Sequence, residues 1–134
     1  MRILLVIHGY PRRYNAGSEV YTQTLAHALV DAGCHVEIFA REEDPFLPDY
    51  HLKKESDPLR PEIPVHLVNH ARSNARFQND GIDEIFQSVL QSVSPDIVHF
   101  GHLNHLSMGL PRIVKQANLP VVFTLHDFVF MCPR

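Results

Sequence analysis

Short apolar runs that end on polar residues constrain the fold of this chain most. A continuous aliphatic run at residues 2–8 ends in His8 and Gly9, and a second run at residues 120–125 ends on His126 and Asp127. Strands that are buried on both faces of a parallel sheet have this composition. Open α/β sheets bind their ligands at the carboxyl ends of such strands. We therefore expect a parallel sheet whose functional residues follow the strands.

The rest of the sequence alternates between strand and helix patterns. Strands are predicted at residues 2–8, 34–40, 63–69, 96–100 and 120–125, and helices at 18–32, 80–93 and 106–118. Gly33 is a good stop for the first helix, Asp80 is the expected cap of the second, and Pro111 should lie in the first turn of the third or bend it. Residues 41–62 carry charges and four prolines, and we expect them to be irregular. The alternation predicts a Rossmann-like α/β fold with helices on both faces of a parallel sheet.

Composition narrows the possible partners and compartments. The 134 residues, of which 45% are hydrophobic and 20% charged, suit one globular domain, and the net charge of −3 gives no reason to expect a nucleic acid or an anionic membrane as partner. Apolar runs are shorter than the ~18 residues of a membrane span, and the N-terminus has the features of a strand rather than of a signal peptide. Cys34 and Cys132 are too few for a disulfide scaffold or a zinc site. We expect a cytoplasmic protein.

The first loop at the expected ligand edge suggests an anion site. Ala16, Gly17 and Ser18 bring a small-residue turn to the start of a helix, where free backbone N–H groups and the helix dipole favour a phosphate. Alternatively, Gly17 merely permits the turn. A dinucleotide site is not expected, because Gly9 lies too far from Gly17 for the G-x-G-x-x-G fingerprint.

Histidines at the other strand ends are the remaining candidates. His99, His102 and His105 are spaced by three, but a zinc site would need a helix there, and His99 lies in a strand pattern. We expect His99 to pack or hydrogen-bond within the sheet, and His102 and His105 to lie at the edge, with His102 contacting a polar ligand.

His126 is either a satisfied core histidine or a cleft residue that contacts a substrate hydroxyl or stabilises developing charge. Asp127 is expected to orient the His126 ring or to cap the following turn. Cys132 has no base assigned to it and is expected to be a small buried apolar residue rather than a nucleophile.

Taken together, these segments resemble the N-terminal domain of family 4-type glycosyltransferases, which have the two-domain GT-B fold. The resemblance covers nearly the whole chain and rests on the order and spacing of several short pieces. They are residues 1–8, 16–21, 25–29, 33–36, 95–100 and 120–134, the last similar to the family's Thr-x-His-Asp segment.

The resemblance implies transfer of a sugar from a nucleotide-sugar donor, usually with retention at the anomeric carbon and without an obligatory metal or other cofactor. The acceptor would be a glycan, a lipid or a small molecule. Gly17 and its neighbour Ala16 would approach the donor diphosphate, although the family often has two glycines there. His126 would stand at the reaction centre, and His102 on the acceptor side.

The same resemblance implies that residues 1–134 form the acceptor-side domain of a longer protein. In the family, a C-terminal domain with an E-x7-E motif binds the donor, and these residues do not provide it. We therefore expect the isolated chain to be inactive. Nothing in these residues encodes membrane association of the parent protein. The alternative is a non-catalytic α/β module that binds a carbohydrate or a protein. In a transferase, loops such as 41–62 and 70–79 are expected to set the choice of acceptor.

Overall fold

Every strand and helix predicted from the sequence is present. The computed structural model describes residues 1–72 and 78–128 of the chain. In these ranges the elements follow in the order β1 (Arg2–Ile7), α1 (Gly17–Asp31), β2 (His35–Glu42), β3 (Leu52–Ser56), β4 (Pro64–Asn69), α2 (Asp80–Val93), β5 (Ile97–Phe100), α3 (Leu110–Gln116) and β6 (Val121–Phe123).

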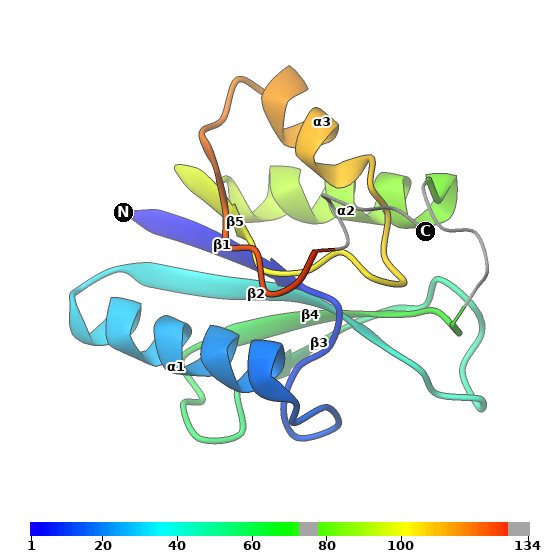
Figure 1. Ribbon diagram of the computed structural model, residues 1–134, viewed down its shortest axis with the longest axis horizontal. Coiled ribbons are helices and arrows are strands. Elements are labelled where there is room, and N and C mark those ends of the chain that lie inside the picture. Colours follow the sequence, from blue (N-terminus) through cyan, green and yellow to red (C-terminus); the bar gives the residue numbers. More distant parts are fainter. Residues whose placement is uncertain (73–77, 129–134) are drawn as a thin grey trace.

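The strands form one sheet in the order β3-β4-β2-β1-β5-β6. All neighbouring pairs are parallel except β3 with β4, which is antiparallel. Helix α1 covers one face of the sheet, and α2 and α3 cover the other (Figure 1). The predicted α/β architecture with helices on both faces is therefore confirmed, and the carboxyl ends of β1, β2, β5 and β6 share one edge.

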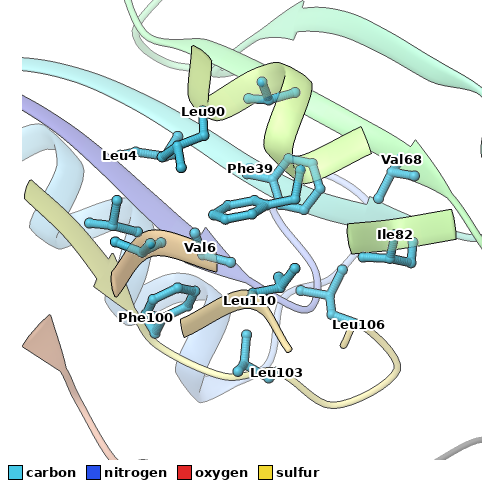
Figure 2. Close-up of a cluster of buried hydrophobic side chains, with 14 of the residues drawn as sticks. Leu4, Val6, Phe39, Val68, Ile82, Leu90, Phe100, Leu103, Leu106 and Leu110 are labelled. Carbon is cyan, nitrogen blue, oxygen red and sulfur yellow. The ribbon is translucent and has the colours of Figure 1, made fainter. Parts of the chain in front are cut away.

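The core consists of two layers because successive side chains of a strand point to opposite faces. On β1, Leu4 and Val6 pack with the side chains of α2 and α3, while Leu5 and Ile7 pack on the side of α1. Figure 2 shows the first layer, in which Phe39 lies among residues from β1, α2 and α3. From Ile3 to Ile7 the first strand is apolar, in keeping with the burial of both its faces.

The expectation of an irregular segment at residues 41–62 was wrong for β3. This strand pairs with β4 through a register that includes Lys53 opposite Leu67. Lys53 Nζ lies 2.9 Å from Glu42 Oε1 and 3.3 Å from Glu55 Oε1, so β3 is held by ion pairs as well as by its ladder. A charged edge strand lacks the apolar alternation by which strands are found in a sequence.

Helix ends differ from the expectations in two places. The N-cap of α2 is Asn79 rather than Asp80, and its side chain accepts a hydrogen bond of 3.1 Å from the backbone of Ile82. Helix α3 begins at Leu110 rather than at residue 106, with Pro111 in its first turn as predicted. Gly33 ends α1 with a positive φ of 89°, also as predicted.

Some expectations fall on residues outside the described ranges. Residues 129–134, with Cys132, and residues 73–77 of the 70–79 loop belong to this group. Among the helices of the described ranges, none combines the length and the apolar character that a bilayer span requires.

Candidate functional site

The residues that follow β1, β5 and β6 come together at one edge of the sheet. The register pairs Val6 of β1 with Phe100 of β5, and Phe100 with Phe123 of β6. Hydrogen bonds continue past the strand ends, from Gly101 N–H to Val6 O and from Thr124 N–H to Phe100 O. His8, His102, His126 and Asp127 therefore leave the sheet near each other, beside the first turn of α1.

His8 is paired with a buried carboxylate. Its Nε2 lies 2.9 Å from Oε1 of Glu19, which is buried in the first turn of α1. Burial is the main cause that lowers the pKa of His8 from 6.5 to about 4, and the nearby His102 adds to it, whereas Glu19 acts in the opposite direction. His8 is therefore neutral at neutral pH. Because Nε2–H donates to Glu19, Nδ1 carries a lone pair, and this atom is buried without a hydrogen-bond partner in the described structure.

His102 is held at both ring nitrogens. The backbone N–H of Asn104 donates to Nδ1 at 3.0 Å, so the ring proton must lie on Nε2 when the ring is neutral. Nε2 is 2.8 Å from Oδ2 of Asp127. The ring of His102 meets that of His8 edge to face, with centroids 4.6 Å apart. Four side chains, Glu19, His8, His102 and Asp127, thus form a continuous series, which we call the rim cluster.

His126 lies on the α1 side of the same edge. Its ring packs edge to face on that of Tyr21, with centroids 5.0 Å apart. Nε2 of His126 is buried and has no hydrogen-bond partner among the described residues. We expected Asp127 to orient His126 or to cap a turn, and the structure places its carboxylate against His102.

The other two histidines of the 99–105 series lie apart from each other. His99 Nε2 is 2.7 Å from Thr124 Oγ1, a hydrogen bond between β5 and the end of β6 that agrees with the expectation. Burial, followed by the neighbouring His126, lowers the pKa of His99. His105 has a lowered pKa through burial and then through Arg41 and Arg72. It therefore lies toward the ends of β2 and β4.

The described residues contain no group of three or more His, Cys, Asp or Glu side chains arranged to hold a metal ion. The three histidines at 99, 102 and 105 diverge because they lie in a strand and the loop that follows it rather than on one helix.

The loop before α1 leaves the helix N-terminus open. Ala16 is the N-cap and makes no side-chain capping bond, and Gly17 is the first helical residue. A Cβ atom added to Gly17 would meet nothing within 4 Å, so open space adjoins its Cα. Ser18 Oγ donates to Glu19 Oε2 at 3.1 Å. Backbone N–H groups of the first turn are therefore available to an anion.

His8 and Glu19 are not among the site residues predicted from the sequence. His8 ends an apolar strand just as His126 does, which is the signal that had pointed to His126. Glu19 shares the inward face of α1 with Thr22 and Ala26, at the spacing of a buried helical stripe. A carboxylate on such a stripe needs a partner, and His8 is that partner.

Comparison with known proteins agrees with this description. The sequence matches the family described as Glycosyltransferase Family 4 over residues 15–132. Sucrose-phosphate synthase from Thermosynechococcus elongatus has a similar structure, with 16% identity, a TM-score of 0.56, and coverage of 96% of this chain and 34% of that one. The trehalose-6-phosphate synthase from E. coli, bound with UDP-2-fluoro glucose, gives 18% identity, a TM-score of 0.55, and coverage of 94% and 33%.

Both solved structures are GT-B glycosyltransferases, and at these identities they show that the fold is shared. This chain spans about a third of the length of each. No curated protein sequence matches it significantly. Because the family match covers residues 15–132, which is most of the chain, the chain belongs to glycosyltransferase family 4.

Proposed function

We propose that this chain is the acceptor-side domain of a retaining glycosyltransferase that moves a sugar from a nucleotide-sugar donor to a hydroxyl-bearing acceptor. The observation that carries the proposal is the convergence of His126 and the rim cluster beside the open N-terminus of α1. Membership of glycosyltransferase family 4 supplies the reaction class. A length of about a third of the related enzymes supports the view that a second domain binds the donor.

The helix N-terminus suits the leaving group of such a reaction. As the glycosidic bond to the donor breaks, negative charge develops on the diphosphate and the sugar takes on oxocarbenium character. Backbone N–H groups at Ala16, Gly17 and Ser18 and the dipole of α1 stabilise that negative charge without reorganising. The open space at Gly17 lets a phosphate approach the backbone closely.

The histidines suit the hydroxyl groups of the sugars. Nε2 of His126 is free to exchange a hydrogen bond with a hydroxyl of the donor sugar or of the acceptor. Nδ1 of His8 is an acceptor only, because Glu19 holds the ring proton at Nε2. Asp127 fixes His102 on the acceptor side, and His105 flanks it. No step of this proposal uses a metal ion.

The test is to read the gene beyond the codon for Arg134 and to assay two proteins. Both the 134-residue chain and any longer product are supplied with a panel of nucleotide sugars, and release of the nucleoside diphosphate is measured. Turnover by the longer product and none by the 134-residue chain is the expected result. Steady transfer by the short chain would contradict the two-domain proposal, and a gene that stops at Arg134 without activity would leave a non-catalytic binding module.

A further inference from the structure

A hollow of about 530 Å³ lies beside the ends of β2 and β4. Three parts of the chain line it, namely Tyr14 in the loop after β1, several residues between 43 and 49 after β2, and Ala71 after β4. Because β2 and β4 are parallel neighbours, the segments that follow them leave the sheet at the edge where the candidate site lies. The volume is in the range of sites that bind small molecules.

Asn69, the last residue of β4, fixes the wall of the hollow. Its side chain is buried, and Nδ2 donates to the backbone oxygens of Asp44, Leu47 and Pro48 at 3.1, 2.9 and 3.1 Å. Oδ1 of the same amide accepts the backbone N–H of Asp44 at 2.8 Å. The loop after β2 thus takes its shape from one buried amide. A wall that is already formed binds a ligand without the entropy cost of ordering a loop.

The lining of the hollow combines apolar surface with carboxylates. The ring of Tyr14 and the side chains of Pro45 and Leu47 are apolar, and Asp44 and Asp49 add carboxylate oxygens. Oδ1 of Asp44 accepts the backbone N–H of the next residue but one at 2.9 Å, which leaves Oδ2 for a ligand. Carboxylates accept hydrogen bonds from hydroxyl groups, and apolar walls pack against C–H groups. A sugar ring carries both kinds of group.

The charge of the hollow disfavours anions. Asn79 caps α2 with its Oδ1 and places Nδ2 3.1 Å from Nε2 of His70, so the ring proton of His70 lies on Nδ1. This neutral ring faces Asp49, with Nδ1 3.2 Å from Oδ1, and does not cancel the charge of the carboxylate. The described residues that line the hollow include no Lys or Arg. A phosphate or carboxylate in the hollow would therefore be repelled by Asp44 and Asp49.

The hollow borders the histidines of the candidate site. Burial lowers the pKa of His105, and Glu43, on the wall of the hollow, acts in the opposite direction. Burial also lowers the pKa of His8, and His105 is among the further causes. In the sheet, β2 and β4 are the first and second neighbours of β1, at about 5 and 10 Å from it. A sugar in the hollow thus lies beside the rim cluster rather than at its centre.

We propose that the hollow binds an uncharged sugar unit of the acceptor and selects against acceptors that carry a phosphate or a carboxylate at this position. The proposal rests on the proposed function in one respect, that the acceptor approaches this edge of the sheet. It adds the chemical class of the acceptor and names Asp44 and Asp49 as the residues that accept hydrogen bonds from its hydroxyl groups.

Methyl NMR of the 134-residue chain tests the proposal at the walls of the hollow. The methyl resonances of Leu47 and Ala71 are followed while the members of a panel of uncharged hexoses and disaccharides are added one at a time. Saturable movement of both resonances with at least one sugar is expected, because both residues line the hollow. Movement that only grows linearly with every sugar, or none at all, would overturn the proposal, and neither result depends on a variant.

Two further ligands test the role of charge. The phosphorylated form of the sugar that binds should bind about tenfold or more weakly than the uncharged sugar, because its phosphate meets the carboxylates. Equal or tighter binding of the phosphorylated form would overturn the proposal. Ethylammonium, a cation without hydroxyl groups, should leave both methyl resonances unmoved. If it bound as tightly as the sugar, negative charge alone would account for binding, and the proposal would be overturned.

A substitution of Asp44 tests the contact itself. Asp44→Asn keeps an oxygen for the backbone N–H that Oδ1 accepts, so the loop keeps its shape. The uncharged sugar should bind about tenfold or more weakly, because a hydroxyl group loses a charged acceptor, and the preference over the phosphorylated form should narrow.

Asp31→Asn is the matched control for Asp44→Asn. It makes the same chemical change at the end of α1, where Asp31 is 63% exposed and outside the lining of the hollow. Its affinity for the uncharged sugar should equal that of the wild type. Equal affinity of Asp44→Asn and wild type in the same titration would overturn the assignment.

The outcomes distinguish this inference from the proposed function, because none of the measurements needs a nucleotide sugar. If an uncharged sugar binds in the hollow but the gene product transfers no sugar, the proposed function fails alone. If the gene product transfers sugar and no uncharged sugar binds in the hollow, this inference fails alone.

Discussion

His102 and Asp127 face each other across the ends of β5 and β6, with Nε2 of the imidazole 2.8 Å from Oδ2 of the carboxylate. The backbone N–H of Asn104 occupies the opposite ring nitrogen. A backbone donor cannot change its role, so the main chain sets the tautomer of His102 and the carboxylate then fixes the direction of the ring. The segment after β6 is thereby attached to the loop after β5.

We predict that neutral His102 is the Nε2–H tautomer and stays so when Asp127 is changed to Asn. The amide oxygen of Asn still accepts from Nε2–H, and Asn104 still donates to Nδ1. Long-range ¹H–¹⁵N NMR of histidine-labelled protein near pH 8 distinguishes the two nitrogens. A proton found on Nδ1 in the wild type would show that the Asn104 contact is not formed in solution.

We predict that His126→Ala in the active gene product lowers kcat by about a hundredfold or more, the range for loss of a positioned polar group at a reaction centre. His126→Phe should do the same while keeping a ring against Tyr21, and its melting temperature should stay close to that of the wild type. The exposed His51 provides the control, and His51→Ala should leave kcat unchanged. Normal turnover by His126→Phe would assign His126 a packing role.

We predict that Gly17→Val raises the donor KM about tenfold or more, the equivalent of about 1.4 kcal/mol of binding free energy. The added side chain meets no protein atom within 4 Å at its Cβ, so it projects into the space assigned to the diphosphate and leaves the fold intact. The donor KM of Gly17→Ala should lie between those of the wild type and Gly17→Val. Initial-rate kinetics on the active gene product measure the effect. An unaltered donor KM in both variants would show that the donor diphosphate does not bind at this turn.

The elements of the fold can be predicted from the sequence because their signals are local. The apolar run of β1 and the helical stripe of α2 are each complete within one segment. The continuous run predicts a strand that is buried on both faces, and the stripe predicts a helix that is buried on one face. The charged strand β3 has no such signal, since its ladder to β4 and its ion pairs with Glu42 come from elsewhere in the chain.

Pairings in the candidate site were harder to predict for the same reason. The sequence places His102 and Asp127 at strand ends, but their contact depends on β5 and β6 being neighbours, and strand order is a property of the whole sheet. His8 and Glu19 are only eleven positions apart, yet they meet because α1 folds back over β1.

We predict that Asp57→Asn lowers the free energy of unfolding by on the order of 2–4 kcal/mol. The Asp57 carboxylate is fully buried and accepts hydrogen bonds from Tyr10 Oη, Gln23 Nε2 and the backbone N–H groups of Leu59 and Arg60. The amide of the variant has only one acceptor oxygen. Its two N–H groups would face hydrogen-bond donors that now donate to the second carboxylate oxygen of Asp57.

Urea unfolding measures the effect of Asp57→Asn, with Asp31→Asn as its control. Asp31 pairs with Arg60 at 2.6 Å but is 63% exposed, so its loss should cost less than about 1 kcal/mol. Equal losses in the two variants would show that the bonds to Asp57 are not formed in the folded chain.

We predict that His8 makes the folded chain sensitive to mild acid. Its pKa is about 4 in the folded protein and about 6.5 in the unfolded chain, so between these values the unfolded state binds a proton that the folded state does not. Stability therefore falls as the pH is lowered through this window, and His8 alone accounts for about 2 kcal/mol between pH 7 and pH 5. The lowered pKa values of His99 and His105 act in the same direction.

The pH range of the measurement distinguishes the effect of His8 on stability from the effect of the carboxylates. Asp57 and Glu55 have lowered pKa values, so their contribution is lost only below the ordinary range of carboxyl groups. His8→Gln keeps an N–H for Glu19 and cannot titrate. Urea unfolding at pH 7 and pH 5 should therefore show a smaller loss for His8→Gln than for the wild type, whereas His35→Gln, at an exposed site, should match the wild type. An identical loss in His8→Gln and wild type would mean that His8 is not buried as a neutral ring.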